Sequence, residues 1–232
     1  MFWDESGVSL LPVTRRTWAP RGRTPVICHH FNWKRASMAA GLCYGSRGGG
    51  AQLAFYHQVG AYDTDTLIGA LEGLRRFLGG EKATLLWDGL PAHRSHAMRA
   101  WLRRQRHWLV VEPLPAYAPD LNPVEPLWSN LKGVELANLA GDTLDDVIAA
   151  AERGIQRIRH THHLAYSFLR YCGLSLWGVT MSPELANLFK DDRRSGRCGG
   201  RRSPSARCAA PGLDSGTAAA AARWRRQSSS PM

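Results

Sequence analysis

The chain has 232 residues, of which 44% are hydrophobic and 21% charged, enough apolar material for one folded domain with a core. Its apolar runs are far shorter than the roughly 20 residues of a membrane span, and its first residues lack the basic and apolar regions of a secretory signal, which disfavours membrane and secreted classes. The formal net charge is +11 and suggests an anionic partner, but residues 193–232 carry +8 of it.

Apolar periodicity and turn residues predict strands in the first part of the chain and an alternation of strands and helices after it. The helix predicted over 63–78 has Asp63 or Thr64 as its N-cap and Gly79 after its end. This order of elements favours a mixed α/β sheet with helices packed on it. The predicted strands are 1–6, 25–31, 35–44, 51–58, 84–87 and 108–111, and the other predicted helices are 95–106, 122–133, 143–160 and 162–171.

The last part of the chain differs from the rest in composition. Residues 193–232 are rich in Arg, Gly, Ser, Ala and Pro and hold few large apolar side chains, so we predict a disordered tail after a folded domain of residues 1–192. The tail is either a basic arm that grips phosphates or a non-selected extension, and we favour the second interpretation. Five cysteines at unrelated spacings do not suggest a disulfide framework, which fits a reducing compartment.

Three acidic residues stand where predicted elements begin or end. Asp4 follows the apolar Phe2-Trp3, Asp88 ends the strand Leu85-Leu86-Trp87, and Glu125 opens a helix. Each acid alone is readily explained as a cap or turn residue. Together they indicate more, because ligands bind at the carboxyl ends of strands in open α/β sheets and converging carboxylates repel unless a divalent cation joins them.

The segments around these acids resemble a DDE transposase of the mariner-like group of bacterial insertion sequences. The most specific segment runs from Leu114 to Trp128 and contains Tyr117-Ala118-Pro119-Asp120-Leu121-Asn122-Pro123-Val124-Glu125. Trp87-Asp88-Gly89 with the following His93, and Trp3-Asp4-Glu5-Ser6-Gly7, add to it. The 36 residues between Asp88 and Glu125 are close to the spacing of that group, and the resemblance covers about residues 1–190.

This resemblance implies a ribonuclease H-like fold, a mixed five-stranded sheet flanked by helices. It implies that the catalytic residues Asp4, Asp88 and Glu125 are also the metal ligands and hold two Mg²⁺ ions, with Mn²⁺ able to substitute. The implied reactions are DNA cleavage at the element's ends and strand transfer into target DNA. By the same analogy we expect a homodimer on DNA, in the bacterial cytoplasm and associated with the nucleoid.

Six further residues are candidates for DNA contact or for support of the site. His93 and Asn122 lie close in sequence to the second and third acids and could orient a phosphate or a carboxylate, although His93 could equally cap the next helix. Basic residues could follow a DNA backbone, but a solvated surface explains any one of them as well. They are Arg16 and Arg21 after the first strand, and Arg99 and Arg103 on the helix at 95–106.

The sequence departs from the family pattern in two ways. It begins only a few residues before Asp4, so we expect either that a separate chain supplies the helix-turn-helix region that recognises element ends or that the gene is truncated. The first strand is expected to be clipped, with loose geometry at Asp4. Two rival functions therefore stay open: an inactive remnant that only binds DNA non-specifically, and a related nuclease that acts on RNA or hybrids.

Overall fold

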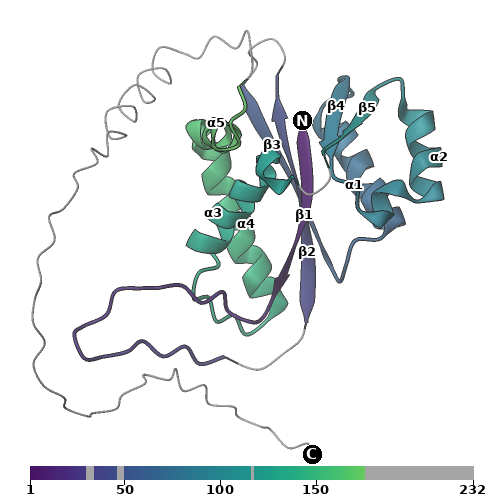
Figure 1. The fold of residues 1–232 in the computed structure, drawn as a ribbon. Coiled ribbons are helices and arrows are strands. Elements are labelled where there is room, and N and C mark those ends of the chain that lie inside the picture. Colours follow the sequence, from purple (N-terminus) through teal and green to yellow (C-terminus); the bar gives the residue numbers. More distant parts are fainter. Residues whose placement is uncertain (30–33, 46–49, 116–117, 176–232) are drawn as a thin grey trace, which may run out of the picture. The chain divides into compact units, whose positions relative to one another are not determined.

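The computed structural model describes residues 1–29, 34–45, 50–115 and 118–175. Five strands form one sheet in the order β3-β2-β1-β4-β5 (Figure 1). The first three strands pair antiparallel, and β4 pairs parallel with both β1 and β5. The mixed five-stranded sheet that the family resemblance implies is confirmed. The strands are β1 (Phe2–Ser9), β2 (Arg35–Tyr44), β3 (Ala51–Val59), β4 (Ala83–Trp87) and β5 (Leu109–Pro113).

Helices cover both faces of the sheet (Figure 1). Because successive strand residues point to opposite faces, Met38, Ala40 and Leu42 of β2 join one core with α3, α4 and α5, whereas Ala39 and Cys43 join the other core with α1 and α2. Both faces of the central strands are therefore buried. The helices are α1 (Thr64–Phe77), α2 (His96–Gln105), α3 (Val124–Val134), α4 (Leu144–His160) and α5 (His162–Tyr171), with short 3-10 helices at Pro91–Arg94 and Pro119–Leu121.

Side-chain caps fix where three of the helices begin. Asp63 forms a capping box with Thr66 at the start of α1, and Thr143 forms one with Asp146 at the start of α4. The Ser95 hydroxyl accepts a 3.1 Å hydrogen bond from the Met98 backbone N–H and caps α2. The N-cap predicted at Asp63 is confirmed.

The first strand is not clipped, contrary to the sequence expectation. It continues to Ser9, and its residues pair with β2 over their whole length, with Asp4 opposite Ala40. The clipped strand was expected because only three residues precede Asp4. The strand gains its length after Asp4 instead, because pairing with β2 continues to Ser9 and overrides the weak strand propensity of Ser and Gly. Asp4 consequently lies inside a paired strand rather than at a frayed end.

The strand predicted over 25–31 is wrong for the part that the structure describes. Residues 25–29 are irregular, and Val26 is 69% exposed. Pro25 has no N–H to donate to a ladder, and no apolar face of this segment is buried. Residues 10–29 instead form a long connection between β1 and β2, joined to the body by the Val13–Ala137 bridge.

Helix α3, which carries the third acid, is held tightly against α4. The Arg157 guanidinium of α4 forms an ion pair with Glu135 just after α3, with Nε 2.5 Å from Oε1. Gly154 of α4 lies so close to α3 that an added Cβ would come within 2.3 Å of Leu131 Cδ1. This close approach fixes α3 relative to the rest of the core.

Two predictions concern the ends of the chain and its environment. The boundary between residues 192 and 193, and the tail after it, lie outside the described residues. Within the described residues, no helix combines the length and apolarity needed to cross a membrane.

Candidate active site

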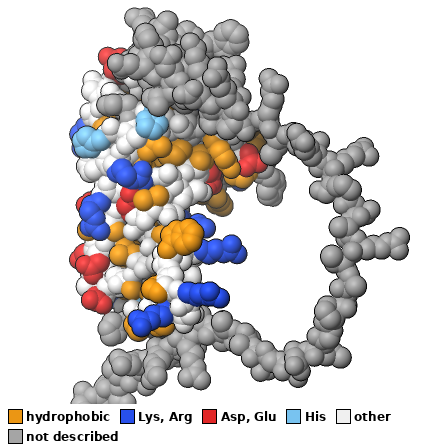
Figure 2. Space-filling model, turned by 90° about the vertical axis from the view of Figure 1, so that its left-hand side faces the viewer, with side chains coloured by type: hydrophobic (Ala, Val, Ile, Leu, Met, Phe, Trp, Pro, Cys, Tyr) orange, Lys and Arg blue, Asp and Glu red, His pale blue; other side chains and the backbone are white. Residues whose placement is uncertain are grey.

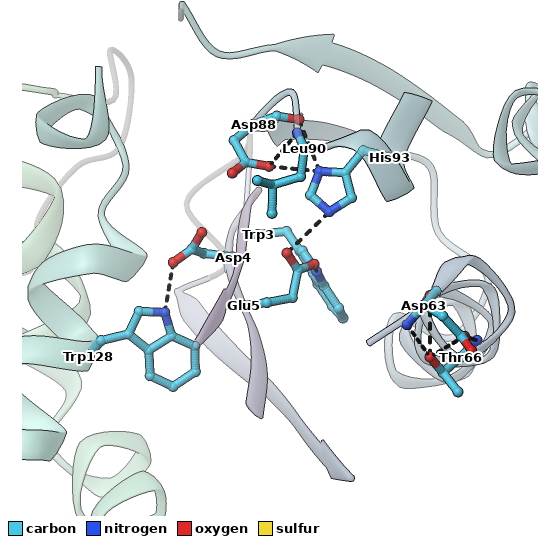
Figure 3. Close-up of polar contacts among 9 residues, drawn as sticks. All are labelled: Trp3, Asp4, Glu5, Asp63, Thr66, Asp88, Leu90, His93 and Trp128. Carbon is cyan, nitrogen blue, oxygen red and sulfur yellow. Dashed lines mark hydrogen bonds and ion pairs between the residues drawn. The ribbon is translucent and has the colours of Figure 1, made fainter. Parts of the chain in front are cut away.

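The first predicted acid, Asp4, is buried in the middle of the sheet. Alternation along β1 points it to the face covered by α3, and only 7% of it is exposed. Its Oδ2 accepts a 2.8 Å hydrogen bond from the indole N–H of Trp128 on α3 (Figure 3). One hydrogen bond does not replace all the water contacts that an ionised carboxylate loses on burial.

This incomplete replacement of hydration raises the pKa of Asp4. Burial raises it most, the negative charge of Glu125 raises it further, and the hydrogen bond from Trp128 lowers it, giving a pKa of about 7. Glu5 and Asp88 add smaller repulsions in the same direction. The three predicted acids thus act on one another electrostatically, as a shared cation site requires.

The second acid, Asp88, directly follows β4 and is held by His93. Its Oδ1 lies 2.7 Å from His93 Nδ1, and its backbone carbonyl oxygen lies 3.1 Å from the same nitrogen. The 3-10 helix at Pro91–Arg94 turns the chain back so that His93 reaches Asp88. The Trp87 ring stacks on the imidazole with ring centroids 3.7 Å apart, which fixes the plane of the histidine.

The other ring nitrogen of His93 contacts Glu5, the neighbour of Asp4 in β1. His93 Nε2 lies 3.2 Å from Glu5 Oε2, and Trp3 Nε1–H donates a 2.6 Å hydrogen bond to Glu5 Oε1 (Figure 3). Burial lowers the pKa of His93, but the bonds to Asp88 and Glu5 outweigh it and raise the pKa to about 9. A protonated His93 therefore bridges two carboxylates at neutral pH.

Three of these side chains also meet the spacing of a metal-ligand group. One ligand atom from each of Glu5, Asp88 and His93 lies within 4.8 Å of the others. The imidazolium contacts both carboxylates and offsets one of their two negative charges. Asp4 and Glu125 have no partner cation within salt-bridge distance among the described residues, so negative charge is uncompensated on the Asp4 side of β1 as well.

The third acid, Glu125, is exposed in the first turn of α3. Asn122 is 3% exposed, and its side-chain Oδ1 accepts a 3.2 Å hydrogen bond from the Val124 N–H. The backbone carbonyl oxygen of Asn122 accepts a second hydrogen bond, from the Glu125 N–H. The buried amide of Asn122 thus fixes the turn from which Glu125 projects. The helix begins at Val124, two residues later than predicted.

Helix α3 also carries a cation, Lys132, close enough for Glu125 and Asp4 to affect its pKa. Lys132 Nζ donates a 2.7 Å hydrogen bond to Ser6 Oγ in β1. Burial lowers the pKa of Lys132, whereas the charges of Glu125 and Asp4 raise it. Lys132 therefore offsets part of the negative charge of the site.

The four candidate arginines are all exposed but lie on two separate elements. Arg16 and Arg21 are in the connection after β1, and Arg99 and Arg103 are on α2. Helix α2 packs on the core of Trp3 and Trp87, the face of the sheet opposite α3. The structure therefore does not gather these arginines around the three acids.

Sequence reasoning missed Trp128, Lys132 and Glu5 as members of the site. Trp128 and Lys132 stand three and seven residues after Glu125, the spacing of one helix face, which was the available signal. Glu5 points to the opposite face of β1 from Asp4 and reaches the site only through His93. No sequence pattern indicates that connection.

The three predicted acids are of the ligand type that a hard divalent cation prefers, but among the described residues the ligand atoms that lie within 4.8 Å of one another belong to Glu5, Asp88 and His93 and not to Asp4 or Glu125. Asp4, Asp88 and Glu125 offer carboxylate oxygens, which Mg²⁺ and Mn²⁺ prefer. The raised pKa of Asp4 shows a buried carboxylate that additional positive charge would stabilise in its ionised form.

Fold and site together define a class of proteins, the ribonuclease H-like nucleases, with carboxylates on the first strand, after the fourth strand and on a later helix. The model of the DDE superfamily endonuclease family matches residues 1–147, more than half of the chain. The chain therefore belongs to the DDE superfamily endonucleases, as the sequence resemblance indicated. No curated protein matches it in a sequence search.

Solved structures of the Mos1 mariner transposase share the fold. The Mos1 paired end complex with Mg has a TM-score of 0.53 and 18% identity, covering 74% of this chain and 52% of that chain. The Mos1 strand transfer complex has a TM-score of 0.51 and 17% identity, covering 74% and 50%. The present chain thus spans about half the length of the Mos1 chains that it matches.

Proposed function

We propose that this chain is the catalytic domain of a DNA transposase, which cleaves DNA at the ends of a mobile element and transfers those ends into target DNA. The observation that carries the proposal is the buried Asp4 carboxylate, bonded to Trp128 of the helix that carries Glu125, whose pKa is raised most by burial and further by the charge of Glu125. Carboxylates are kept in such unfavourable proximity when a bound cation compensates them. Family membership supports a nuclease function for that cation site.

In this proposal Asp4, Asp88 and Glu125 hold two Mg²⁺ ions, and Mn²⁺ can replace them. Bound divalent cations supply an activated nucleophile and stabilise the charge that develops on the leaving oxygen. In the first reaction a water oxygen attacks a phosphodiester and releases a 3′-hydroxyl at the element's end. In the second reaction that hydroxyl attacks a phosphodiester of the target, so no covalent bond to the protein forms.

The surrounding residues keep the acids in place during both reactions. Trp128 holds the Asp4 carboxylate through its indole N–H, and His93 holds that of Asp88 through Nδ1. Asn122 fixes the turn that presents Glu125. Each contact limits rotation of a carboxylate, and such partners orient metal ligands and tune their basicity.

DNA is the proposed partner. Four arginines are exposed and can therefore contact phosphates of the element's ends or of the target DNA: Arg16, Arg21, Arg99 and Arg103. The similar Mos1 structures are a paired end complex and a strand transfer complex, which supports the same two-stage chemistry here. We also propose a homodimer on DNA in the nucleoid, with sequence recognition from a separate helix-turn-helix chain.

The test is a cleavage assay with supercoiled plasmid and Mg²⁺ or Mn²⁺, comparing wild type with Asp88→Asn. We expect metal-dependent nicking that falls at least roughly 100-fold in the variant, because charged ligands are lost from the site. Asp65→Asn, in the exposed first turn of α1, is the control and should cut like wild type. Equal nicking by wild type and Asp88→Asn would overturn the proposal.

The same assay separates the two rival functions. A remnant that only binds DNA would bind the plasmid without cutting it. If the tail contributes to that binding, deletion of residues 193–232 would lower both the affinity for DNA and its dependence on salt. A nuclease for RNA or hybrids would cut those substrates in preference to duplex DNA. Joining of a 3′-hydroxyl oligonucleotide to plasmid would support strand transfer.

A further inference from the structure

A cavity lies beside the end of β1, on the face of the sheet that α3 and α4 cover. Its volume is about 320 Å³, at the lower end of the roughly 300–1,000 Å³ of small-ligand sites. Three of its walls are buried apolar side chains: Val8 of β1, Leu136 just after α3, and Val147 of α4. Figure 2 shows the side of the molecule that carries α3, α4 and α5, where hydrophobic and basic side chains both reach the surface.

The rim of the cavity is held in place by hydrogen bonds of the chain after α3. The Asn138 N–H donates a 2.8 Å hydrogen bond to the Val13 carbonyl oxygen, and the Asn138 Oδ1 accepts one of 2.8 Å from the Arg15 N–H. Leu11 and Val13, which line the cavity, are thereby fixed beside the end of α3. The cavity is therefore preformed, as small-ligand sites usually are.

Two cations and no carboxylate line the cavity. Lys132 and Arg35 are the charged members of its lining, and neither forms an ion pair within the part of the chain that the structure describes. The Lys132 ammonium has three N–H donors, of which one bonds Ser6 Oγ, so two remain for a ligand. Burial lowers the pKa of Lys132, whereas Asp4 and Glu125 raise it. An anion in the cavity would therefore meet positive charge that water solvates only in part.

We infer that this cavity binds a small monocarboxylate with an apolar body, its carboxylate on Lys132 and Arg35 and its body against Val8, Leu136 and Val147. The body leaves water for an apolar surface, and hydrogen bonds from charged donors orient the carboxylate. A lone phosphate group would meet the cations but leave the apolar walls bare. The inference does not depend on the proposed function, since neither a metal ion nor DNA takes part in this binding.

The test is an NMR titration of the isotope-labelled full chain with 4-phenylbutyrate, in buffer without divalent metal ions or DNA. We expect saturable shift changes that are concentrated at the backbone amides of Val8, Leu136 and Val147. The neutral isostere 4-phenylbutanamide should bind roughly tenfold more weakly, because it lacks the charge that Lys132 recognises. Inorganic phosphate should give no saturable change at these amides, because it has no apolar body.

Substitutions in the lining separate the charge from the shape of the cavity. Lys132→Met keeps an apolar stem and removes the ammonium, so 4-phenylbutyrate should bind roughly tenfold more weakly while the amide binds about as before. Arg35→Met should act in the same direction with a smaller effect, because Arg35 is exposed. Leu139→Trp fills the cavity from its half-buried rim and should abolish binding of both compounds. Arg76→Met, on α1 at the other face of the sheet, is the matched control and should bind like wild type.

Three results would each overturn the inference. The first is equal affinity for the acid and the amide, and the second is an affinity that neither Lys132→Met nor Leu139→Trp alters. The third is the absence of saturable changes around the cavity with 4-phenylbutyrate and also with the shorter 3-phenylpropionate and the more flexible octanoate, all at millimolar concentration. Amide shifts away from the cavity that match those of wild type show that each variant is folded.

Discussion

The indole N–H of Trp128 donates a 2.8 Å hydrogen bond to Oδ2 of Asp4, and thereby links the catalytic helix α3 to the central strand β1. The two residues are 124 positions apart in sequence, and both are buried. Lys132, one helical turn further along α3, contacts Ser6 two residues after Asp4. One face of α3 thus supports β1 at two successive inward positions.

Replacement of Trp128 by Phe removes the donor and keeps an aromatic ring in the core. Because the hydrogen bond lowers the pKa of Asp4, its loss should raise that pKa and free the carboxylate to rotate. We expect Mn²⁺ affinity to fall roughly 10–100-fold, the usual effect of removing such a partner. Isothermal titration calorimetry at pH 8 measures it. Trp101→Phe, which removes the donor to Glu72 on the other face, should bind Mn²⁺ like wild type.

Stability in metal-free buffer should fall as pH rises from about 4 to about 9, because of Asp4 and His93. The folded pKa of Asp4, about 7, is above its unfolded value of 3.8, so the native state binds more protons between them and stability is lost over that window. His93 has a folded pKa of about 9 against 6.5, so its contribution is present below 6.5 and is lost as pH rises through 9. Urea unfolding across this pH range measures both.

Single variants should separate the two parts of this pH profile. Asp4→Asn should flatten the fall between pH 4 and 7, and at pH 8 it should be more stable than wild type by up to about 4 kcal/mol, at 1.36 kcal/mol for each pKa unit. His93→Gln should flatten the upper part. Mn²⁺ should stabilise wild type at pH 8 and leave Asp4→Asn nearly unchanged. An unaltered profile in Asp4→Asn would contradict the assignment.

The contact between Glu5 and His93 makes a separate prediction about one histidine. Glu5→Gln replaces a charged partner of Nε2 by a neutral one, so the pKa of His93 should fall from about 9. Titration of the His93 ring proton by NMR measures the shift. Glu152→Gln, which alters the 3.1 Å contact of Glu152 with His57 on the exposed surface, is the control and should leave the titration of His93 unchanged. A titration of His93 unaltered by the substitution would mean that Glu5 does not hold its proton.

Local signals in the sequence were sufficient for most of the fold but not for the support of the site. Helix α1 and its cap at Asp63 followed from apolar spacing and a residue type. The length of β1 did not, because pairing with β2 decides it and the sequence after Glu5 is weak for a strand. The three acids came from motif positions, whereas the roles of Glu5 and His93 depend on a strand and a 3-10 helix meeting in space.

The position of α3 depends on a glycine in the neighbouring helix, which can be tested directly. In Gly154→Ala the new Cβ would lie 2.3 Å from Leu131 Cδ1 and 2.7 Å from the Glu135 carboxyl carbon, so the buried Leu131 side chain and the Glu135 carboxylate must move. We expect a loss of about 1–3 kcal/mol in the free energy of unfolding, the usual cost of overpacking. Gly69→Ala in α1 is the matched control: nothing lies within 4 Å of its added Cβ, so alanine's higher helix propensity should stabilise the protein by up to about 1 kcal/mol. Equal stability of the two variants in urea unfolding would show that α3 is not held by this contact.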